Sequence, residues 1–461
     1  MSMLEFCTQS SRNDGDFSAN TERLVNFYPE PIPEGGRARF VLRSVLGSEE
    51  WAQLPGVFIR ALGVVFDRDE DGAMIERLFS VIGGDLFKVA SNGTLENLGA
   101  VGDSVDTTLT GNNGDVLVVC EGKYYLWNGS TLTEPTAGAF SDFGAVEFLG
   151  GYTILTERNG RRFQWSALGD ATDLPGLNFA SAEGRDDALL RPVAINGNLW
   201  LFKARSTEIW GLTGQASENA FARLGGGVRE RGLLGFNLIA KTPDSAFFVG
   251  DDGICYITDG AQFAPVSRTP VEAAIEKETP TDCFYYEDDG HKFCVVRFRN
   301  RPAWVYDLST GLWHERGDGI DGSWSTTSAV YAYGQWRAGR ADGRISAMLR
   351  NNQDVDGPLI REATSRTLQN MGGRFRVPAI EFMGKVGRSD IGRDASMIVQ
   401  FSRDGGNTWG NERIRSLGDL GEYDKRMVFR QVGQARNLAA RIRITDPADL
   451  RLWSAANVAV V

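Results

Sequence analysis

Short apolar runs joined by tight turns recur along the middle of this chain, and they constrain its fold more than any other feature. In each unit an apolar or aromatic run meets a turn, and a second run of the same kind follows. Several turns are Asn-Gly or Asp-Gly dipeptides, such as Asn159-Gly160 and Asp252-Gly253. These dipeptides supply the positive φ angles that two-residue hairpin turns require. The pattern therefore predicts a series of β-hairpins, which the 55 glycines of the chain suit.

The spacing of the hairpins narrows the architecture. Their turns fall near residues 84, 122, 160, 205, 253, 300 and 343, at steps of 38 to 48 residues. A period of about 40–50 residues, each unit a small antiparallel sheet, is typical of a β-propeller. Blades stacked around an axis bury faces that a single blade leaves exposed. We expect an all-β fold with six or seven blades, because the seventh hairpin, Tyr333–Met348, is weak. A run of hairpins in sandwich domains is the alternative.

The segments that flank the repeats differ from them. Residues 1–60 include three prolines between positions 29 and 33, which favour an extended N-terminal arm. The propeller is expected over residues 61–350, and the polar residues 351–372 indicate a linker. In residues 373–461 charged and apolar residues alternate along the expected strands, as in a sheet with one buried face. This region is predicted to be a small C-terminal β-sandwich-like domain. Helix should be scarce, with Val271–Lys277 as the best candidate.

Composition argues against several classes of protein. No stretch is apolar enough for a transmembrane helix, and Met1–Asp16 lacks the apolar core of a secretory signal. The five cysteines form no CxxC pair, which indicates reduced thiols in a protein assembled inside a cell. The two histidines, His291 and His314, lie far apart in the sequence and offer no His-rich metal site. We therefore expect no metal and no cofactor.

Charge is distributed unevenly along the chain. Residues 341–461 contain 19 Lys and Arg against 14 Asp and Glu, a net charge of +5. The rest of the chain contains 30 against 46, a net charge of −16. An acidic body with a basic end suits docking on an acidic partner, whereas the overall sign does not favour binding of free nucleic acid. Codon bias in a GC-rich genome is the alternative explanation for the many arginines.

No motif in the sequence joins a nucleophile to a base. GxSxG, HExxH and Walker elements are all missing. The acidic groups Asp251-Asp252 and Glu287-Asp288-Asp289 resemble glycosidase carboxylates or calcium ligands, but they fall at predicted turns, where acidic residues are common. We expect no catalytic residues, and the chain is not predicted to be an enzyme.

Residues 402–409 match the Asp-box pattern S-x-D-x-G-x-T-W. Its Asp can satisfy turn amides while its Trp packs beneath the hairpin. We interpret Ser402, Asp404, Gly406 and Trp409 as residues of a structural hairpin. Asp boxes also occur in sialidase-like propellers, so a sialidase-like or lectin-type carbohydrate-active β-propeller is the alternative function.

Six cations lie close together near the C-terminus: Lys425, Arg426, Arg430, Arg436, Arg441 and Arg443. On alternating strands most of them would face solvent. They form either an ordinary charged sheet face or a candidate interface with another subunit or partner, because arginine forks suit pairing with carboxylates.

Several stretches resemble one family, the tail hub proteins of short-tailed (podovirus) phages, also called packaged DNA stabilisation proteins. The similar stretches are Asn26–Pro29, Leu54–Val57, Thr207–Gly214, Arg231–Gly235 and Glu422–Arg426. They occur in this order and extend from about residue 20 to residue 445.

The resemblance implies a structural virion protein without catalysis. Members of this family form a ring, a homohexamer, below the portal and its adaptor ring. They extend and help close the DNA channel, retain packaged DNA, support tailspikes or fibres, and seat the needle or plug until genome ejection. The resemblance places this chain in the virion tail, assembled in the host cytoplasm and without membrane insertion. Packaged DNA would pass without sequence-specific binding, along a lumen that we expect to be lined by acidic residues.

Overall fold

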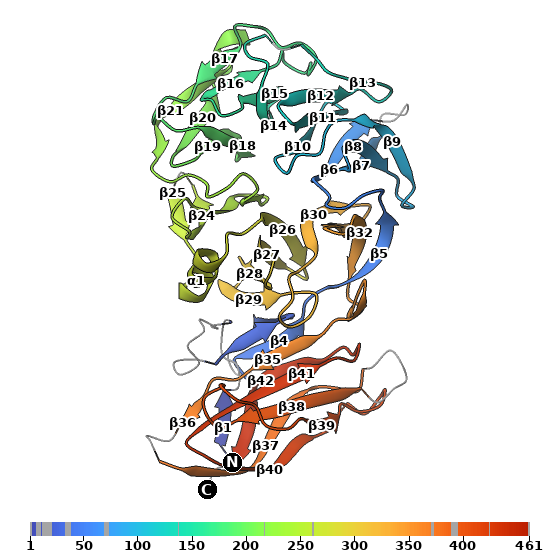
Figure 1. Ribbon diagram of the computed structural model, residues 1–461, viewed down its shortest axis with the longest axis vertical. Coiled ribbons are helices and arrows are strands. Elements are labelled where there is room, and N and C mark those ends of the chain that lie inside the picture. The colour runs from blue at the N-terminus through green and yellow to red at the C-terminus, as the bar shows by residue number, and fades with distance from the viewer. Residues whose placement is uncertain are drawn as a thin grey trace.

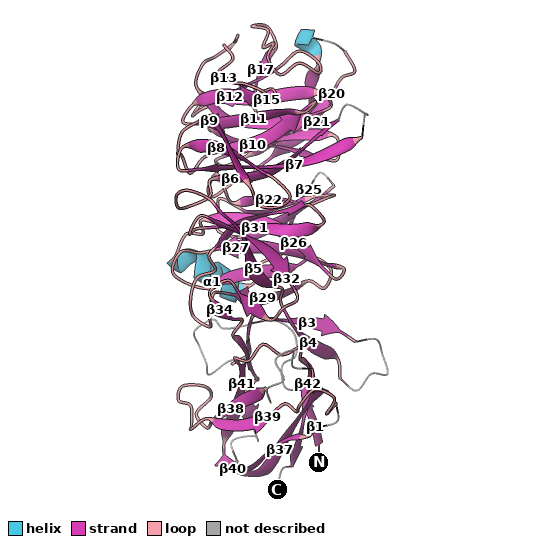
Figure 2. Cartoon of the chain, turned by 90° about the vertical axis from the view of Figure 1, so that its right-hand side faces the viewer, coloured by secondary structure: helices cyan, strands magenta, loops and turns pink. Residues whose placement is uncertain are grey.

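A computed structural model describes residues 2–5, 11, 21–32, 38–68, 73–136, 138–215, 217–260, 262–369, 373–388, 395–423 and 425–459. These residues form a ring of small sheets, and two further sheets lie beyond one side of the ring (Figures 1 and 2). Strands dominate, and the single α-helix of the described residues, α1 (Thr269–Lys277), covers the segment expected to be helical. No described helix is long and apolar enough to cross a membrane.

The ring is a β-propeller whose described residues form seven four-stranded antiparallel blades. Blades one and two contain β6 (Ala61–Arg68), β7 (Met74–Ile82), β8 (Asp85–Val89) and β9 (Leu95–Ala100), then β10 (Thr108–Asn112), β11 (Asp115–Cys120), β12 (Lys123–Trp127) and β13 (Leu132–Thr133). Blades three and four contain β14 (Phe143–Leu149), β15 (Tyr152–Glu157), β16 (Arg162–Trp165) and β17 (Phe179–Ser181), then β18 (Leu189–Ile195), β19 (Asn198–Lys203), β20 (Thr207–Leu212) and β21 (Phe221–Arg229). Blades five and six contain β22 (Ile239–Lys241), β23 (Ala246–Val249), β24 (Cys255–Asp259) and β25 (Gln262–Pro265), then β26 (Asp282–Asp288), β27 (His291–Arg297), β28 (Ala303–Asp307) and β29 (Leu312–Arg316).

The seventh blade closes the ring with a strand from the N-terminal region. It contains β30 (Thr326–Ala332), β31 (Gln335–Arg340), β32 (Arg344–Leu349) and β5 (Gly47–Gln53). Strand β5 pairs antiparallel with β32, and β30 contacts β6 of blade one. The seventh hairpin, whose sequence signal is weak, is therefore part of the ring. Residues 47–53, which were expected to belong to an extended arm, form part of the propeller because they supply the missing outer strand.

Local turn chemistry explains why the blades form where the sequence predicts hairpins. In Gly83-Gly84 and Glu121-Gly122 both residues have positive φ, as a type I′ turn requires. The strands between such turns bury apolar side chains between neighbouring blades. Phe79, for example, is fully buried in a cluster shared by blades one and two. Hairpin formation and blade stacking thus follow from the same repeated pattern.

The second domain is a β-sandwich. One sheet contains β3 (Phe27–Pro31), β4 (Phe40–Ser44), β42 (Arg451–Ala459), β37 (Phe375–Lys385) and β40 (Met427–Ala435), and β1 (Ser2–Glu5) pairs with β42. The facing sheet contains β2 (Arg23–Val25), β35 (Arg361–Thr364), β41 (Asn437–Ile444), β38 (Ser396–Ser402) and β39 (Arg413–Ser416), and β36 (Leu368–Gln369) pairs with β41. Phe27, Phe382, Phe401 and Phe429 belong to the core between the two sheets.

The two domains share one continuous sheet of ten strands. Strand β2 pairs in parallel with β29 of blade six and antiparallel with β35 of the sandwich. Residues 351–372, expected to be a linker, carry the short hairpin β33 (Gln353–Asp354) and β34 (Gly357–Pro358) as well as β35 and β36. The polar sequence gave no strand signal, because the charged side chains of β35 pair with neighbouring residues in the sheet and do not enter an apolar core.

Candidate functional site

The six C-terminal cations lie on two different sheets of the sandwich. Arg430 is on β40, and Lys425 and Arg426 immediately precede that strand, whereas Arg441 and Arg443 are on β41 in the facing sheet. Arg436 lies in the turn between the two strands. The structure therefore does not bring the six residues together on one face.

Arg441 and Arg443 have partners within the protein. Arg443 Nη2 lies 3.0 Å from Oε2 of Glu362, which is almost fully buried on β35. Arg441 Nη2 donates to Gln400 Oε1 at 2.6 Å, and its guanidinium lies 4.4 Å from the ring centre of Trp409. These two arginines serve the internal packing of the shared sheet.

The cations on the β40 side divide into paired and free groups. Arg426 Nε lies 2.5 Å from Glu381 Oε1, and Lys425 Nζ lies 2.9 Å from Glu422 Oε2. The exposed guanidinium groups of Arg430 and Arg436 have no hydrogen-bond or ion-pair partner among the described residues.

Sequence reasoning missed Arg376, a third free cation, which lies on β37, the strand that pairs with β40. Arg376 is exposed on β37, directly opposite Gln434 of β40, and its side chain has no partner in the described part of the chain. The alternation of Arg374, Phe375, Arg376 and Val377 was the signal that could have identified it. A candidate interface, the β37–β40 cation patch, thus consists of Arg376, Arg430 and Arg436.

The Asp box forms a structural turn after β38. The Thr408 amide and hydroxyl donate to the Asp404 carboxylate at 2.9 and 2.6 Å, and the Gly406 amide donates to Ser402 Oγ at 2.8 Å. These hydrogen bonds, above all those from Thr408, lower the pKa of Asp404 to about 2. The half-buried Trp409 ring is covered by the Arg441 guanidinium. The motif lies in the sandwich and not in the propeller.

Four of the acidic residues that resembled catalytic or calcium sites, Asp251, Asp252, Asp288 and Asp289, take part in ion pairs. Arg231 lies 3.2 Å from both Asp251 and Asp252. Asp288 pairs with Arg350 at 2.7 Å and Asp289 with Arg43 at 2.6 Å. Within the described residues, no group of three or more His, Cys, Asp or Glu could hold a metal ion.

The two histidines are buried near one another in blade six. Nδ1 of His291 lies 2.7 Å from Asp307, and this hydrogen bond raises the pKa of His291. His314 is fully buried, and burial lowers its pKa to about 3, so it is neutral at physiological pH. Both rings pack against Phe293, which indicates a structural role.

The Asn26–Pro29 stretch joins the two domains. Asn26 has a φ of +57°, and its side-chain amide donates to the carbonyls of Gly317 and Ile360 at 3.0 and 2.7 Å. Phe27 then enters the sandwich core, while Tyr28 packs on His291 and Phe293 of blade six. Consecutive residues are therefore buried in different domains.

The Thr207–Gly214 stretch anchors blade four. Glu208 is fully buried, accepts a hydrogen bond from the Gly184 amide at 2.7 Å, and lies 3.8 Å from the buried Lys203 ammonium. Lys203 also pairs with Asp187 at 2.9 Å. The conspicuous Glu of this stretch is thus part of a buried ionic network.

A cavity of about 700 Å³ opens where the inner strands of several blades begin. Its lining includes Phe58, Val105, Phe236 and Arg299. Asn237 donates to the Val105 carbonyl at 2.8 Å, and this bond joins the segment before blade five to the segment before blade two. The lining combines aromatic, aliphatic and charged groups.

Comparison with known proteins identifies the family. The model described as bacteriophage P22 Gp10, beta-propeller, matches residues 8–352, and the model described as bacteriophage P22 Gp10, beta-sandwich, matches residues 360–460. No curated protein matches the sequence. Among solved structures, the computationally designed Ika8 protein is 15% identical, with a TM-score of 0.38, and the match covers 65% of this chain and 99% of Ika8. BamB from Moraxella catarrhalis is 11% identical, with a TM-score of 0.39 and coverage of 76% and 98%. Because the two family models together span both domains, this chain belongs to the bacteriophage P22 Gp10 family, a podovirus tail hub and DNA-stabilisation family of phage structural proteins.

Proposed function

We propose that this protein is the ring-forming tail hub subunit that docks below the portal–adaptor ring. As a homohexamer it extends and helps close the DNA channel, retains packaged DNA, and supports tailspikes or fibres and the needle until genome ejection. It acts in the virion tail after assembly in the host cytoplasm, and it has no enzymatic role. The observation that carries the proposal is the match of one phage tail family to both the propeller and the sandwich.

The β37–β40 cation patch is the surface that we propose for docking on an acidic partner. Arg376, Arg430 and Arg436 keep free guanidinium groups, which suit bidentate pairing with carboxylates across an interface. We propose that acidic residues of the remaining body line the lumen, because a surface of like charge lets DNA slide. A hexamer structure with mainly Lys and Arg facing the lumen would contradict this second point.

The decisive experiment mixes the purified protein with an assembled portal–adaptor ring for electron microscopy. A six-fold density that caps the adaptor supports the proposal. Replacing Arg376, Arg430 and Arg436 by Gln should lower the affinity for the adaptor ring and make that affinity less dependent on salt concentration. Replacing Arg441 and Arg443 should instead change the stability of the fold. A persistent monomer that binds or cleaves glycans would favour the carbohydrate-active alternative.

A further inference from the structure

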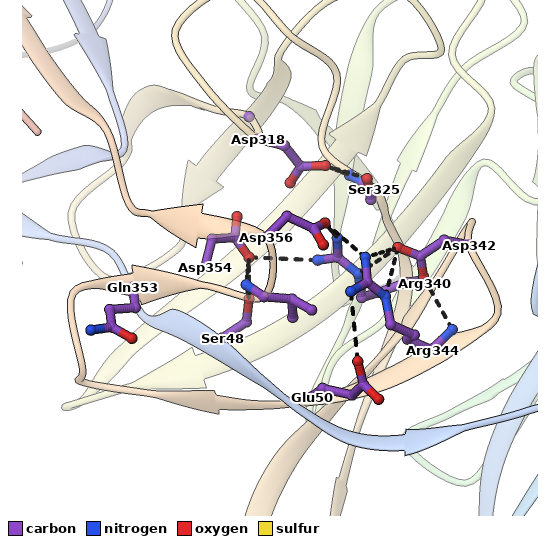
Figure 3. Close-up of polar contacts among 12 residues, drawn as sticks. Ser48, Glu50, Asp318, Ser325, Arg340, Asp342, Arg344, Gln353, Asp354 and Asp356 are labelled. Atoms are coloured by element: carbon purple, nitrogen blue, oxygen red, sulfur yellow. Dashed lines mark hydrogen bonds and ion pairs between the residues drawn. The ribbon is translucent and has the colours of Figure 1, made fainter.

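The seam of the propeller brings together three segments that are distant in the sequence (Figure 3). They are strand β5, the turn between β31 and β32, and the β33–β34 hairpin that leads into the sandwich. Ser48 of β5 forms a hydrogen bond with Asp354 of the hairpin. A side chain at position 47 would collide with the backbone of Gln353, so Gly47 permits this close approach.

One buried guanidinium lies between these segments. Arg340, only 1% exposed, ends β31, and its three nitrogens face three carboxylates. Nε lies 3.2 Å from Asp342, Nη2 lies 3.1 Å from Asp356, and Nη1 lies 3.5 Å from Asp354. A buried charge needs such partners, because their loss would leave it uncompensated.

A second guanidinium reaches all three segments. Arg344 Nη2 lies 2.6 Å from Asp342 and 2.7 Å from Asp356, and Nη1 lies 3.6 Å from Glu50 of β5. Asp356 therefore receives both guanidinium groups, as Figure 3 shows. The beginning of the connection to the sandwich is held by the same side chains that hold the closing strand.

We propose that this cluster is a latch that couples closure of the propeller to the attachment of the sandwich. When β5 leaves β32, the hairpin loses its bond to Ser48, and the connection to β35 is loosened. Opening of the ring at this seam and detachment of the β35 side of the sandwich are then one event.

Hydrogen–deuterium exchange of the full chain tests the coupling. Arg344→Gln should raise amide exchange about tenfold in both β5 and β35, while blade three keeps its protection. Arg77→Gln is the matched control, because Arg77 has similar exposure and pairs with Asp67 at 3.0 Å within blade one. Its effect should be confined to blade one.

A second pair of variants keeps the test informative if Arg344→Gln does not fold. Ser48→Ala removes only the two bonds that join Ser48 of β5 to Asp354 and to the Val355 amide of the hairpin, so it should raise exchange in β35, which Ser48 does not touch. In the Arg344→Gln background, a disulfide between Glu49→Cys and Ala347→Cys, which replace paired residues of β5 and β32, should restore protection to both β5 and β35. Faster exchange in β5 with unchanged β35, or equal effects from Arg77→Gln, would overturn the latch.

Discussion

The propeller and the sandwich close their sheets in different ways. In the propeller, strands that are distant in the sequence complete sheets by backbone pairing: β5 completes blade seven, and β2 extends blade six. In the sandwich, the neighbouring edge strands β39 and β40 do not pair with each other; among described strands each has one partner, β38 and β37.

Arginine side chains bridge that sandwich edge instead. Arg413 donates to the carbonyls of Arg430 and Gln431 at 2.8 and 3.3 Å, and Arg415 Nε donates to the Val428 carbonyl at 3.2 Å. The same guanidinium groups lie over Phe401 and Phe429 of the core. An unpaired strand edge is a site for aggregation, and here side-chain donors take the place of a missing strand. The comparison teaches that strands β5 and β2 complete the ring and the junction, whereas arginine side chains cover the unpaired edge of the sandwich.

The largest expected loss of stability comes from removing one buried aromatic side chain from the core of each domain. Phe79→Ala in the propeller and Phe429→Ala in the sandwich each remove a fully buried ring, at a cost of about 3–5 kcal/mol in unfolding free energy. Because the ten-stranded sheet joins the domains, we expect both domains to unfold in one calorimetric transition, and each variant should lower the midpoint temperature of that transition. Two separate transitions in either variant would show that the domains unfold independently.

Asn26→Ala should make the propeller and the sandwich unfold separately. The substitution removes side-chain bonds to Gly317 and Ile360 and forces a left-handed φ on alanine, at a cost of about 2–4 kcal/mol. We expect the single calorimetric transition to divide into two. Asn26→Gly is the control, because it accepts the φ and loses only the bonds. If both variants unfold as the unmodified protein does, the junction does not depend on Asn26.

Replacing Arg413 and Arg415 by Leu tests the sandwich edge. Loss of their hydrogen bonds should cost about 1–2 kcal/mol and should promote self-association, because the carbonyls of β40 are uncovered. Light scattering and thermal unfolding measure the two effects. Arg430→Leu adds a similar apolar side chain on the adjacent strand without removing a side-chain bond, and it should remain monodisperse under the same conditions.

The smallest effect is expected at the Asp box. The lowered pKa of Asp404 means that its stabilising contribution is present above its unfolded pKa, near 3.9, and disappears as pH falls toward about 2. Because Asp404 is exposed, the contribution should be below about 1 kcal/mol. Asp404→Asn should make the unfolding of the 402–413 hairpin less dependent on pH in the acid range. Amide exchange measures this unfolding, and exchange in the propeller should not change. An unchanged pH profile would contradict this assignment.

Local patterns predicted much of the fold, because hairpin turns depend on neighbouring residues. The propeller with its hairpins, helix α1 and the sandwich followed from such patterns. The pairing of β5 with β32 and the bridging by β2 could not be predicted, since they join residues about 300 positions apart with no local signature. The division of the six cations between two sheets could not be predicted for a related reason: β40 and β41 follow each other directly yet lie in opposite sheets, so alternation along the chain does not reveal a shared face.

The closing strand also affects how the protein is made. Strand β5 leaves the ribosome long before β32, its partner, has been synthesised. Until blade seven emerges, the nascent chain carries an unpaired apolar and acidic strand together with six blades that have no closed ring to stabilise them. Contacts of this sequence separation slow folding and expose intermediates to aggregation. We therefore expect stable propeller structure to form only after translation has passed residue 349, with early blades depending on chaperones in the meantime.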